Sequence, residues 1–330
     1  MPVYPVSGCG SCPGSFGEVI QGIFPDNTKF LMPLKIERYS RASIVIGGRK
    51  DGRMKNVASA SDRSFDKSFQ VIRTILREIR IDQSFTLSIE SALPEGKGLS
   101  SSTADMVSSL RALEKALGIT LSDATISRLI SEIEPNDGLH LTGSVLYDYV
   151  NGKSLFSNSY VPDFFILGFD TGGMVDTVRF NQRTPHFSKK EKQYYKSLAV
   201  KIQEALMIRD KSLIGRIAQK SAELWQKVLP KPNFAEFLSL SKSLSGCGII
   251  NSHSGTYLGI AFDAAKTDRS DLLYLSRNDP FYLFKKYPVT LFETHRQNYL
   301  MRTETIISGM EQTRINNNEA IIRRAPALSM

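Results

Sequence analysis

A glycine- and serine-rich stretch runs from Pro94 to Thr103 and reads Pro-Glu-Gly-Lys-Gly-Leu-Ser-Ser-Ser-Thr. Gly96 and Gly98 leave room for backbone N–H groups to approach a ligand closely, and the hydroxyl side chains add further donors. Lys97 contributes a positive charge, and a helix beginning after the loop would point its partly positive N-terminus at the same place. Together these features predict a site for a polyphosphate such as that of ATP, with a serine hydroxyl available to bind magnesium.

The spacing within this loop excludes several common motifs. The P-loop G-x-x-x-x-G-K-[ST] needs a lysine directly before the serine or threonine, whereas Gly98 and Leu99 intervene here. The chain also lacks the H-R-D and D-F-G motifs of protein kinases and the G-x-S-x-G motif of hydrolases. The loop therefore indicates a different nucleotide-binding fold. The alternative is a flexible turn in front of a well-capped helix.

The elements around the loop are predicted from the spacing of apolar residues. Alternation predicts a strand over 85–90, and apolar residues at helical spacing predict a helix over 106–117 that ends at Gly118, so the loop joins a strand to a helix. Ser122 is the expected N-cap of a second helix, which should stop before Pro135. The remaining expected elements are strands within 30–48, a helix over 67–81, strands at 145–150 and 164–169, two helices within 189–229, strands at 249–250 and 257–262, and a final helix over 291–311.

Length and composition favour a globular protein with two cores. The chain has 330 residues, of which 41% are hydrophobic, and no apolar run approaches the roughly 20 residues of a membrane-spanning helix. The N-terminus lacks the basic and apolar regions of a secretory signal, so a cytoplasmic location is expected. Three cysteines cannot all pair. Cys9 and Cys12 form a C-x-x-C, which suits a tight turn better than zinc, because further ligands are missing.

The formal net charge of +9 suits an anionic partner without identifying it. The basic residues are scattered, and no aromatic residues interleave with them as a nucleic-acid stacking surface requires. We therefore expect small anionic ligands and neither nucleic acid nor a membrane as partners. The sequence leaves the oligomeric state open, a homodimer being one option.

Three blocks of sequence carry a resemblance to a known family. The segment 94–102 resembles the P-x-x-x-G-L-x-S-S signature of the GHMP kinases, which are named for galactokinase, homoserine kinase, mevalonate kinase and phosphomevalonate kinase. The run 12–22, Cys-Pro-Gly-Ser-Phe-Gly-Glu-Val-Ile-Gln-Gly, and the block 253–259, His-Ser-Gly-Thr-Tyr-Leu-Gly, follow the family's order. Together with the turn Glu134-Pro135-Asn136-Asp137-Gly138, these blocks look most like those of the L-threonine kinases of cobalamin synthesis.

The resemblance implies an α+β protein of two domains. Residues 1–155 would form an ATP-binding domain like the second domain of ribosomal protein S5, and residues 156–330 a ferredoxin-like domain. ATP and the acceptor would meet between them. The implied reaction is the transfer of a phosphoryl group from ATP to the hydroxyl of L-threonine, giving O-phospho-L-threonine. ATP and Mg²⁺ are the implied ligands.

The resemblance also implies roles for individual residues. Glu134 would share magnesium with Ser101 or Ser102, and Asp137 would orient or deprotonate the acceptor, with Lys97 as a second catalytic group. ATP would be bound by Pro94, Glu95, Gly96, Lys97, Gly98, Leu99, Ser100, Ser101, Ser102 and Thr103. The acceptor would be bound by Ser15, Glu18, Gln21, Ser254, Gly255 and Thr256. His140 and His253 are expected to be pocket or turn residues rather than an acid or a base.

The chain departs from the wider family at two points, and other functions stay open. The 253–258 block has one glycine where the family usually has several, and Asp137 lacks the S-G-x-D context of the usual base. Glu134 and Asp137 could instead form a helix end followed by a solvated turn. A kinase for homoserine or a sugar is the nearest alternative. A non-catalytic nucleotide or nucleic-acid binder on an S5-like scaffold is the alternative from another class.

Overall fold

The computed structural model describes residues 5–47, 65–175, 185–278, 281–295 and 322–324. Their strands are β1 (Val6–Ile23), β2 (Lys29–Ile46), β3 (Phe85–Ser91), β4 (Ile119–Leu121), β5 (Ser144–Asp148), β6 (Lys153–Asn158), β7 (Phe164–Asp170), β8 (Gly248–Asn251), β9 (Tyr257–Asp263), β10 (Val289–Glu293) and β11 (Ile322–Arg324). Their helices are α1 (Asp66–Glu78), α2 (Ser101–Leu117), α3 (Asp123–Ser131), α5 (Lys189–Met207), α6 (Lys211–Trp225), α7 (Phe234–Ser243), α8 (Arg269–Asn278) and α9 (Tyr282–Lys286). None of the helices in these ranges is long and apolar enough to cross a membrane.

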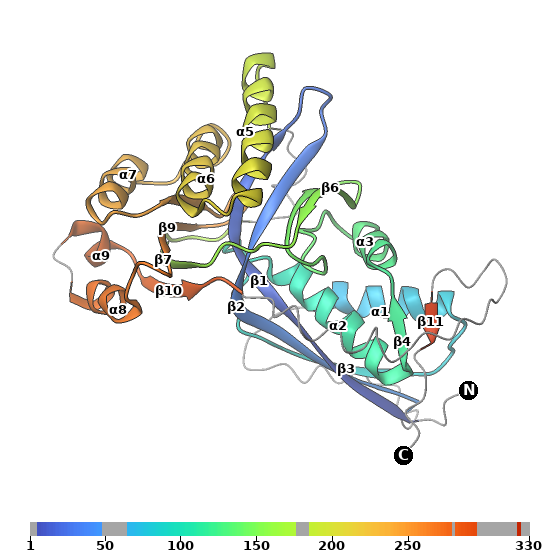
Figure 1. Cartoon of the computed structure of the whole chain (residues 1–330). Helices are drawn as coiled ribbons and strands as arrows, with labels where there is room; N and C mark the ends of the chain where they lie inside the picture. Colours follow the sequence, from blue (N-terminus) through green and yellow to red (C-terminus); the bar gives the residue numbers. More distant parts are fainter. Residues whose placement is uncertain (1–4, 48–64, 176–184, 279–280, 296–321, 325–330) are drawn as a thin grey trace.

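Most of the described strands join one antiparallel sheet of nine strands (Figure 1). Its order is β10-β7-β9-β8-β1-β2-β5-β6, with β3 also paired to β2. The long strands β1 and β2 pair along almost their whole length, and β8 joins them where Glu18 faces Asn251. Strands from the second half of the chain therefore continue the sheet that the first half begins, and the two halves meet at Glu18.

Helix α2 packs on β1 and β2 because glycines on β1 allow close contact. A Cβ atom on Gly10 would lie 2.4 Å from the backbone oxygen of Ser108, so only glycine fits there. The apolar side chains of α1, α2 and the first three strands form one core with those of α5 and α6, and a second core lies under α7 and α8. Figure 1 shows α2 and α1 at one end of the molecule and α6 to α9 at the other. Helix α2 follows the glycine- and serine-rich loop 94–100, called the phosphate loop below, and is thus fixed rigidly to the sheet.

Most of the predicted elements are confirmed. Helix α1 and strands β2, β3, β5, β7, β8 and β9 lie within a few residues of the predicted positions, and the two predicted helices within 189–229 are α5 and α6. Helix α2 ends at Gly118, which has the left-handed conformation predicted for a C-terminal cap. Helix α3 begins at the Ser122 cap, as expected, but ends at Ser131, before Glu134.

Two predictions were wrong in detail. Cys9 and Cys12 lie within β1 and not in a tight turn, with Cys9 exposed, Cys12 buried and both thiols free. The start of the expected 291–311 helix is a strand, β10, because Val289–Glu293 pairs with β7; residues 296–311 lie outside the described part of the chain. The polar stretch 151–158 contains β6, which pairs with β5. The predicted division at residues 155 and 156 falls inside β6 and stays a prediction.

Candidate active site

The loop before α2 has a backbone suited to an anion. Gly96 and Gly98 have positive φ angles of 65° and 78°, and Ser100, the N-cap residue of α2, has φ 58°. A non-glycine residue in this region is strained, and such strain is typical of functional sites. No side chain caps the first turn of α2, whereas Ser122 caps α3 by accepting from the Thr125 N–H. The first N–H groups of α2 therefore have no side-chain cap and are suited to bind an anion.

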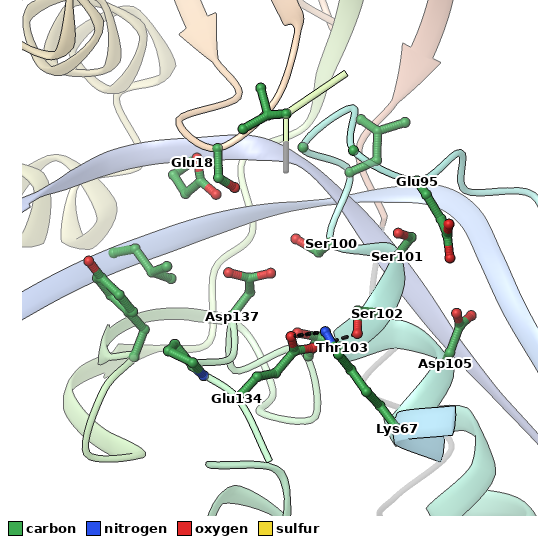
Figure 2. A pocket seen from close by; sticks show the side chains of 18 of the residues that line it. Glu18, Lys67, Glu95, Ser100, Ser101, Ser102, Thr103, Asp105, Glu134 and Asp137 are labelled. Atoms are coloured by element: carbon green, nitrogen blue, oxygen red, sulfur yellow. Dashed lines mark hydrogen bonds and ion pairs between the residues drawn. The ribbon is translucent and has the colours of Figure 1, made fainter. Parts of the chain in front are cut away.

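The loop lines a cavity of about 420 Å³ (Figure 2). The predicted ATP-binding residues that line it are Glu95, Gly96, Gly98, Leu99, Ser100, Ser101, Ser102 and Thr103. The other predicted site residues that line it are Glu18, Gln21, Glu134, Asp137 and Ser254. The described structure thus brings together residues from four separate parts of the chain. Pro94, Lys97, Ser15, Gly255 and Thr256 are predicted site residues that do not line this cavity.

Glu134 lies opposite the first turn of α2. The Ser102 hydroxyl donates to Glu134 Oε1, and Lys67 Nζ forms an ion pair with Glu134 Oε2 (Figure 2). Although α3 has ended, the Glu134 N–H still donates to the Ile130 oxygen, which holds the residue beside the helix. A hydroxyl and a carboxylate oxygen are ligands that magnesium accepts.

The donor set at Glu134 fits a magnesium ion that arrives with a nucleotide. In the described part of the chain, no group of three or more histidine, cysteine, aspartate or glutamate side chains could hold a metal ion alone. Magnesium commonly takes one or two protein ligands and completes its shell with water and substrate phosphates. The Ser102–Glu134 pair at the N-terminus of α2 has this composition.

Asp137 is half-buried in the cavity, and its pKa is raised from 3.8 to about 7. Desolvation is the largest cause, and the nearby carboxylates of Glu18 and Glu134 act in the same direction. Hydrogen bonds from the Ser100 and Thr103 hydroxyls lower the pKa in part. The turn is closed by the buried Asn136, whose Oδ1 accepts from the Gly138 N–H at 3.0 Å. The alternative was a helix end followed by a solvated Asx-turn: the Asx-turn is present, but Asn136 is buried and Asp137 half-buried rather than solvated. A carboxylate that titrates near neutral pH suits proton transfer.

Glu18 is buried at the junction of the two halves of the sheet. It accepts hydrogen bonds from the His253 backbone N–H at 3.0 Å and from His253 Nδ1 at 2.7 Å. Trp225 Nε1 donates to the His253 oxygen at 2.8 Å, and the two rings meet edge to face. His253 is therefore a turn residue, as predicted, and it orients the carboxylate of Glu18. His140 is likewise buried, against Ser127, and burial lowers its pKa to about 3.

The turn between β8 and β9 packs directly on the phosphate loop. A Cβ atom on Gly255 would lie 2.1 Å from the Gly98 nitrogen, so the single glycine of this block is required for the contact. The buried Lys231 donates from Nζ to the backbone oxygens of Ser252 and Gly255. Burial lowers the pKa of Lys231 to about 7. Gly255 thus acts as a packing residue, and the turn supports the loop at Lys97 and Gly98.

Lys97 does not line the cavity. Its Nζ forms an ion pair with Asp170 at 2.7 Å and donates to the Gly173 oxygen at 2.8 Å. Asp170 also accepts from the Thr256 hydroxyl at 2.8 Å, and the Thr256 N–H donates to the Lys97 oxygen at 3.1 Å. Two residues predicted to touch ligands, Lys97 and Thr256, therefore hold the phosphate loop to the end of β7.

Ser15 also contacts the loop and not the cavity. Its hydroxyl lies 2.5 Å from that of Ser100, and its N–H donates to the Leu99 oxygen at 3.2 Å. Ser15 therefore supports the strained Ser100.

Several lining residues were missed by sequence reasoning. They include Lys67, Asp105 and Tyr149. Tyr149 shares a hydrogen bond with Gln21, and burial raises its pKa to about 12. Asp105 directly follows the Ser-Ser-Thr-Ala run in the sequence, and its position next to this motif could have identified it. Lys67 lies on α1 and Tyr149 directly follows β5, but no spacing relates either residue to the loop.

Comparison with known proteins agrees with this geometry. Residues 66–145 match the GHMP kinases N terminal domain. An L-threonine kinase of Citrobacter freundii is 27% identical over 258 residues, which cover 78% of this chain and 87% of the relative. An L-threonine kinase of Salmonella typhimurium is also 27% identical, over 78% of this chain and 83% of the relative.

Solved structures share the fold at lower identity. A homoserine kinase from Cytophaga hutchinsonii superimposes with a TM-score of 0.64 at 14% identity, covering 89% of this chain and 96% of its own. The mevalonate kinase of Methanococcus jannaschii gives a TM-score of 0.61 at 17% identity, covering 89% and 99%. The predicted α+β fold, with the two-domain arrangement of these kinases, is confirmed.

Proposed function

We propose that the acceptor of this enzyme is L-threonine. The chain belongs to the GHMP kinase superfamily and is most like its L-threonine kinases. It is an ATP-dependent kinase acting on an alcohol. The product would be O-phospho-L-threonine, for the aminopropanol branch of cobalamin synthesis that the resemblance implies. A cytoplasmic location, in keeping with the three free cysteines, is part of the proposal.

One observation carries the proposal: the Asp137 carboxylate and the uncapped N-terminus of α2 line the same cavity. Phosphoryl transfer depends mainly on alignment of the acceptor and neutralisation of charge. ATP phosphates at the α2 N-terminus would present their terminal group to a hydroxyl beside Asp137. The acceptor oxygen would bond to the γ-phosphorus as the bond to the β-phosphate oxygen breaks, giving ADP.

The chain's own residues would divide the remaining work. Asp137 would orient the acceptor hydroxyl and accept its proton, for which a pKa of about 7 is suitable. Backbone N–H groups after Gly98 would bind the phosphates, and Ser102 with Glu134 would hold magnesium, which supplies charge neutralisation when bound.

An amino-acid acceptor agrees with the charges beyond Asp137. Glu18 is a buried carboxylate whose partner is His253, and Gln21 lines the cavity beside it. A carboxylate here would attract the ammonium group of an amino acid, and Ser254 offers a hydroxyl to the substrate carboxylate.

The proposal is tested by turnover of a panel of hydroxyl compounds. The purified protein is assayed for ADP release with L-threonine, L-serine, L-homoserine, D-threonine and galactose at equal concentrations. We expect the highest kcat/KM with L-threonine and a weak response to D-threonine. Faster turnover of homoserine or galactose would refute the substrate while leaving the kinase assignment intact.

A further inference from the structure

The described lining of the cavity is strongly acidic for a site that receives a triphosphate. Lys67 is its one basic side chain. Six carboxylates line the same space: Glu18, Asp66, Glu95, Asp105, Glu134 and Asp137. The overall charge of +9 is therefore not concentrated at this site. Because phosphate and carboxylate groups repel each other, the cations present there decide whether a nucleotide binds.

Lys67 forms an ion pair with Glu134, the residue that we propose as a metal ligand. Its Nζ pairs with Glu134 Oε2 while the Ser102 hydroxyl donates to Oε1, so both oxygens of Glu134 have partners (Figure 2). A divalent ion at Glu134 would lie next to the ammonium group, and two cations in contact there repel each other. Metal binding at Glu134 therefore requires Lys67 to move.

Lys67 is able to move without disturbing the fold. Its side chain is 37% exposed, whereas that of Glu134 is 14% exposed. The next residues of α1, Ser68 and Phe69, are buried and keep the backbone in position. The flexible four-carbon stem can therefore carry the ammonium group to a new partner.

We propose that Lys67 is a nucleotide-binding residue with two alternative partners: Glu134 in the free enzyme and the phosphate oxygens of ATP in the complex. In the free enzyme its ammonium group excludes divalent metal from Glu134. When metal and ATP bind together, the phosphates provide a stronger partner for the ammonium and release Glu134 to the metal. Metal then binds tightly only with nucleotide. The inference rests on the proposed role of Glu134 as a metal ligand.

The test compares metal binding with and without nucleotide in the full-length protein. Free Mn²⁺ is titrated by electron paramagnetic resonance against wild type and Lys67→Met, which keeps the stem and removes the charge. We expect the variant to bind Mn²⁺ without nucleotide about fivefold more tightly, because a competing ion pair has been removed. Calorimetric binding of MgADP should weaken about tenfold, because a charged hydrogen-bond donor to phosphate has been lost.

Two further variants serve as controls. Lys201→Met changes an exposed lysine on α5 and should alter neither affinity. Lys67→Arg keeps the charge and should recover most of the MgADP affinity, which loss of packing alone would not allow.

The outcomes separate this inference from the function on which it rests. Unchanged Mn²⁺ affinity in Lys67→Met, while Glu134→Gln weakens Mn²⁺ binding, refutes the inference alone. If Glu134→Gln leaves Mn²⁺ binding unchanged in the Lys67→Met background, the metal ligand and the inference fail together. Phosphorylation of L-threonine is measured separately on the wild type, so failure of the acceptor assignment is recognised independently.

Discussion

Replacement of Asp137 by asparagine is expected to stabilise the protein at alkaline pH while nearly abolishing activity. The pKa of Asp137 in the folded protein is about 7, against 3.8 for an ordinary aspartate, so the folded state binds this proton more tightly than the unfolded state does. Its contribution to the free energy of unfolding is therefore fully present below about pH 4. It is lost as the pH rises through 7.

The size of the effect follows from the pKa difference. About three pH units at 1.36 kcal/mol each set a ceiling of about 4 kcal/mol on the cost of ionising Asp137 in the folded protein. The side chain is half-buried and open to the cavity, so solvent screening reduces the expected gain of Asp137→Asn to about 1–2 kcal/mol at pH 8. At pH 5 the folded wild-type carboxyl is mostly protonated and resembles the amide in shape and charge, but the unfolded carboxyl is already ionised, so the advantage of Asp137→Asn should shrink to about a third of its value at pH 8.

The assay is thermal unfolding of both proteins at pH 5 and pH 8, without metal or nucleotide. We expect Tm of Asp137→Asn to exceed that of the wild type by about 2 °C at pH 8. Asp271→Asn, at an exposed position on α8, is the matched control and should show no such pH dependence. In the kinase assay kcat should fall at least about 100-fold, as for loss of a general base. A stability difference that is the same at both pH values would refute the reasoning.

The other predictions concern the remaining parts of the site. Glu134→Gln should lower kcat about 100-fold or more with intact folding, and near wild-type turnover in saturating Mg²⁺ would remove its metal role. Lys97→Met should raise KM for ATP if the ion pair with Asp170 holds the loop. A double-mutant cycle of Lys97→Met and Asp170→Asn, measured on KM for ATP, should then give a coupling energy of about 1 kcal/mol. Additive effects of the two substitutions would contradict the contact. Gly255→Ala should reduce ATP binding about tenfold, measured by calorimetry, because its Cβ would lie 2.1 Å from the Gly98 nitrogen, and wild-type affinity would show that the loop tolerates displacement.

The chain's periodicity was sufficient to predict much of the secondary structure. The helix at 66–78 and the strand at 85–91 were predictable because their apolar residues recur at the spacing of a single buried face. Strand β1 was missed because Val6–Ile23 is rich in glycine and small polar residues, which local propensity assigns to turns. Pairing with β2 on one side and packing of α2 against its glycines form a strand that its own residues do not favour.

The same contrast divides the candidate site. Ser100 and Ser102 belong to a local motif that the sequence alone shows, whereas Glu134 and Asp137 were singled out by the resemblance to the L-threonine kinases. The two cationic side chains behave differently: the motif suggested Lys97, which pairs with Asp170, while Lys67 in a distant helix lines the cavity. The direction of a long flexible side chain depends on charges brought near it by other segments.

By itself, then, the sequence determined the glycine- and serine-rich loop and the helix behind it, because glycine conformation, hydroxyl donors and helix periodicity are local properties, and the family resemblance singled out the acidic turn. Only the tertiary structure decided how these parts work together. The half-buried environment that raises the pKa of Asp137, the histidine that orients Glu18 and the lysine paired with Glu134 all arise from residues tens to hundreds of positions apart. Desolvation and charge proximity depend on which segments pack together, and the continuous sheet sets that packing.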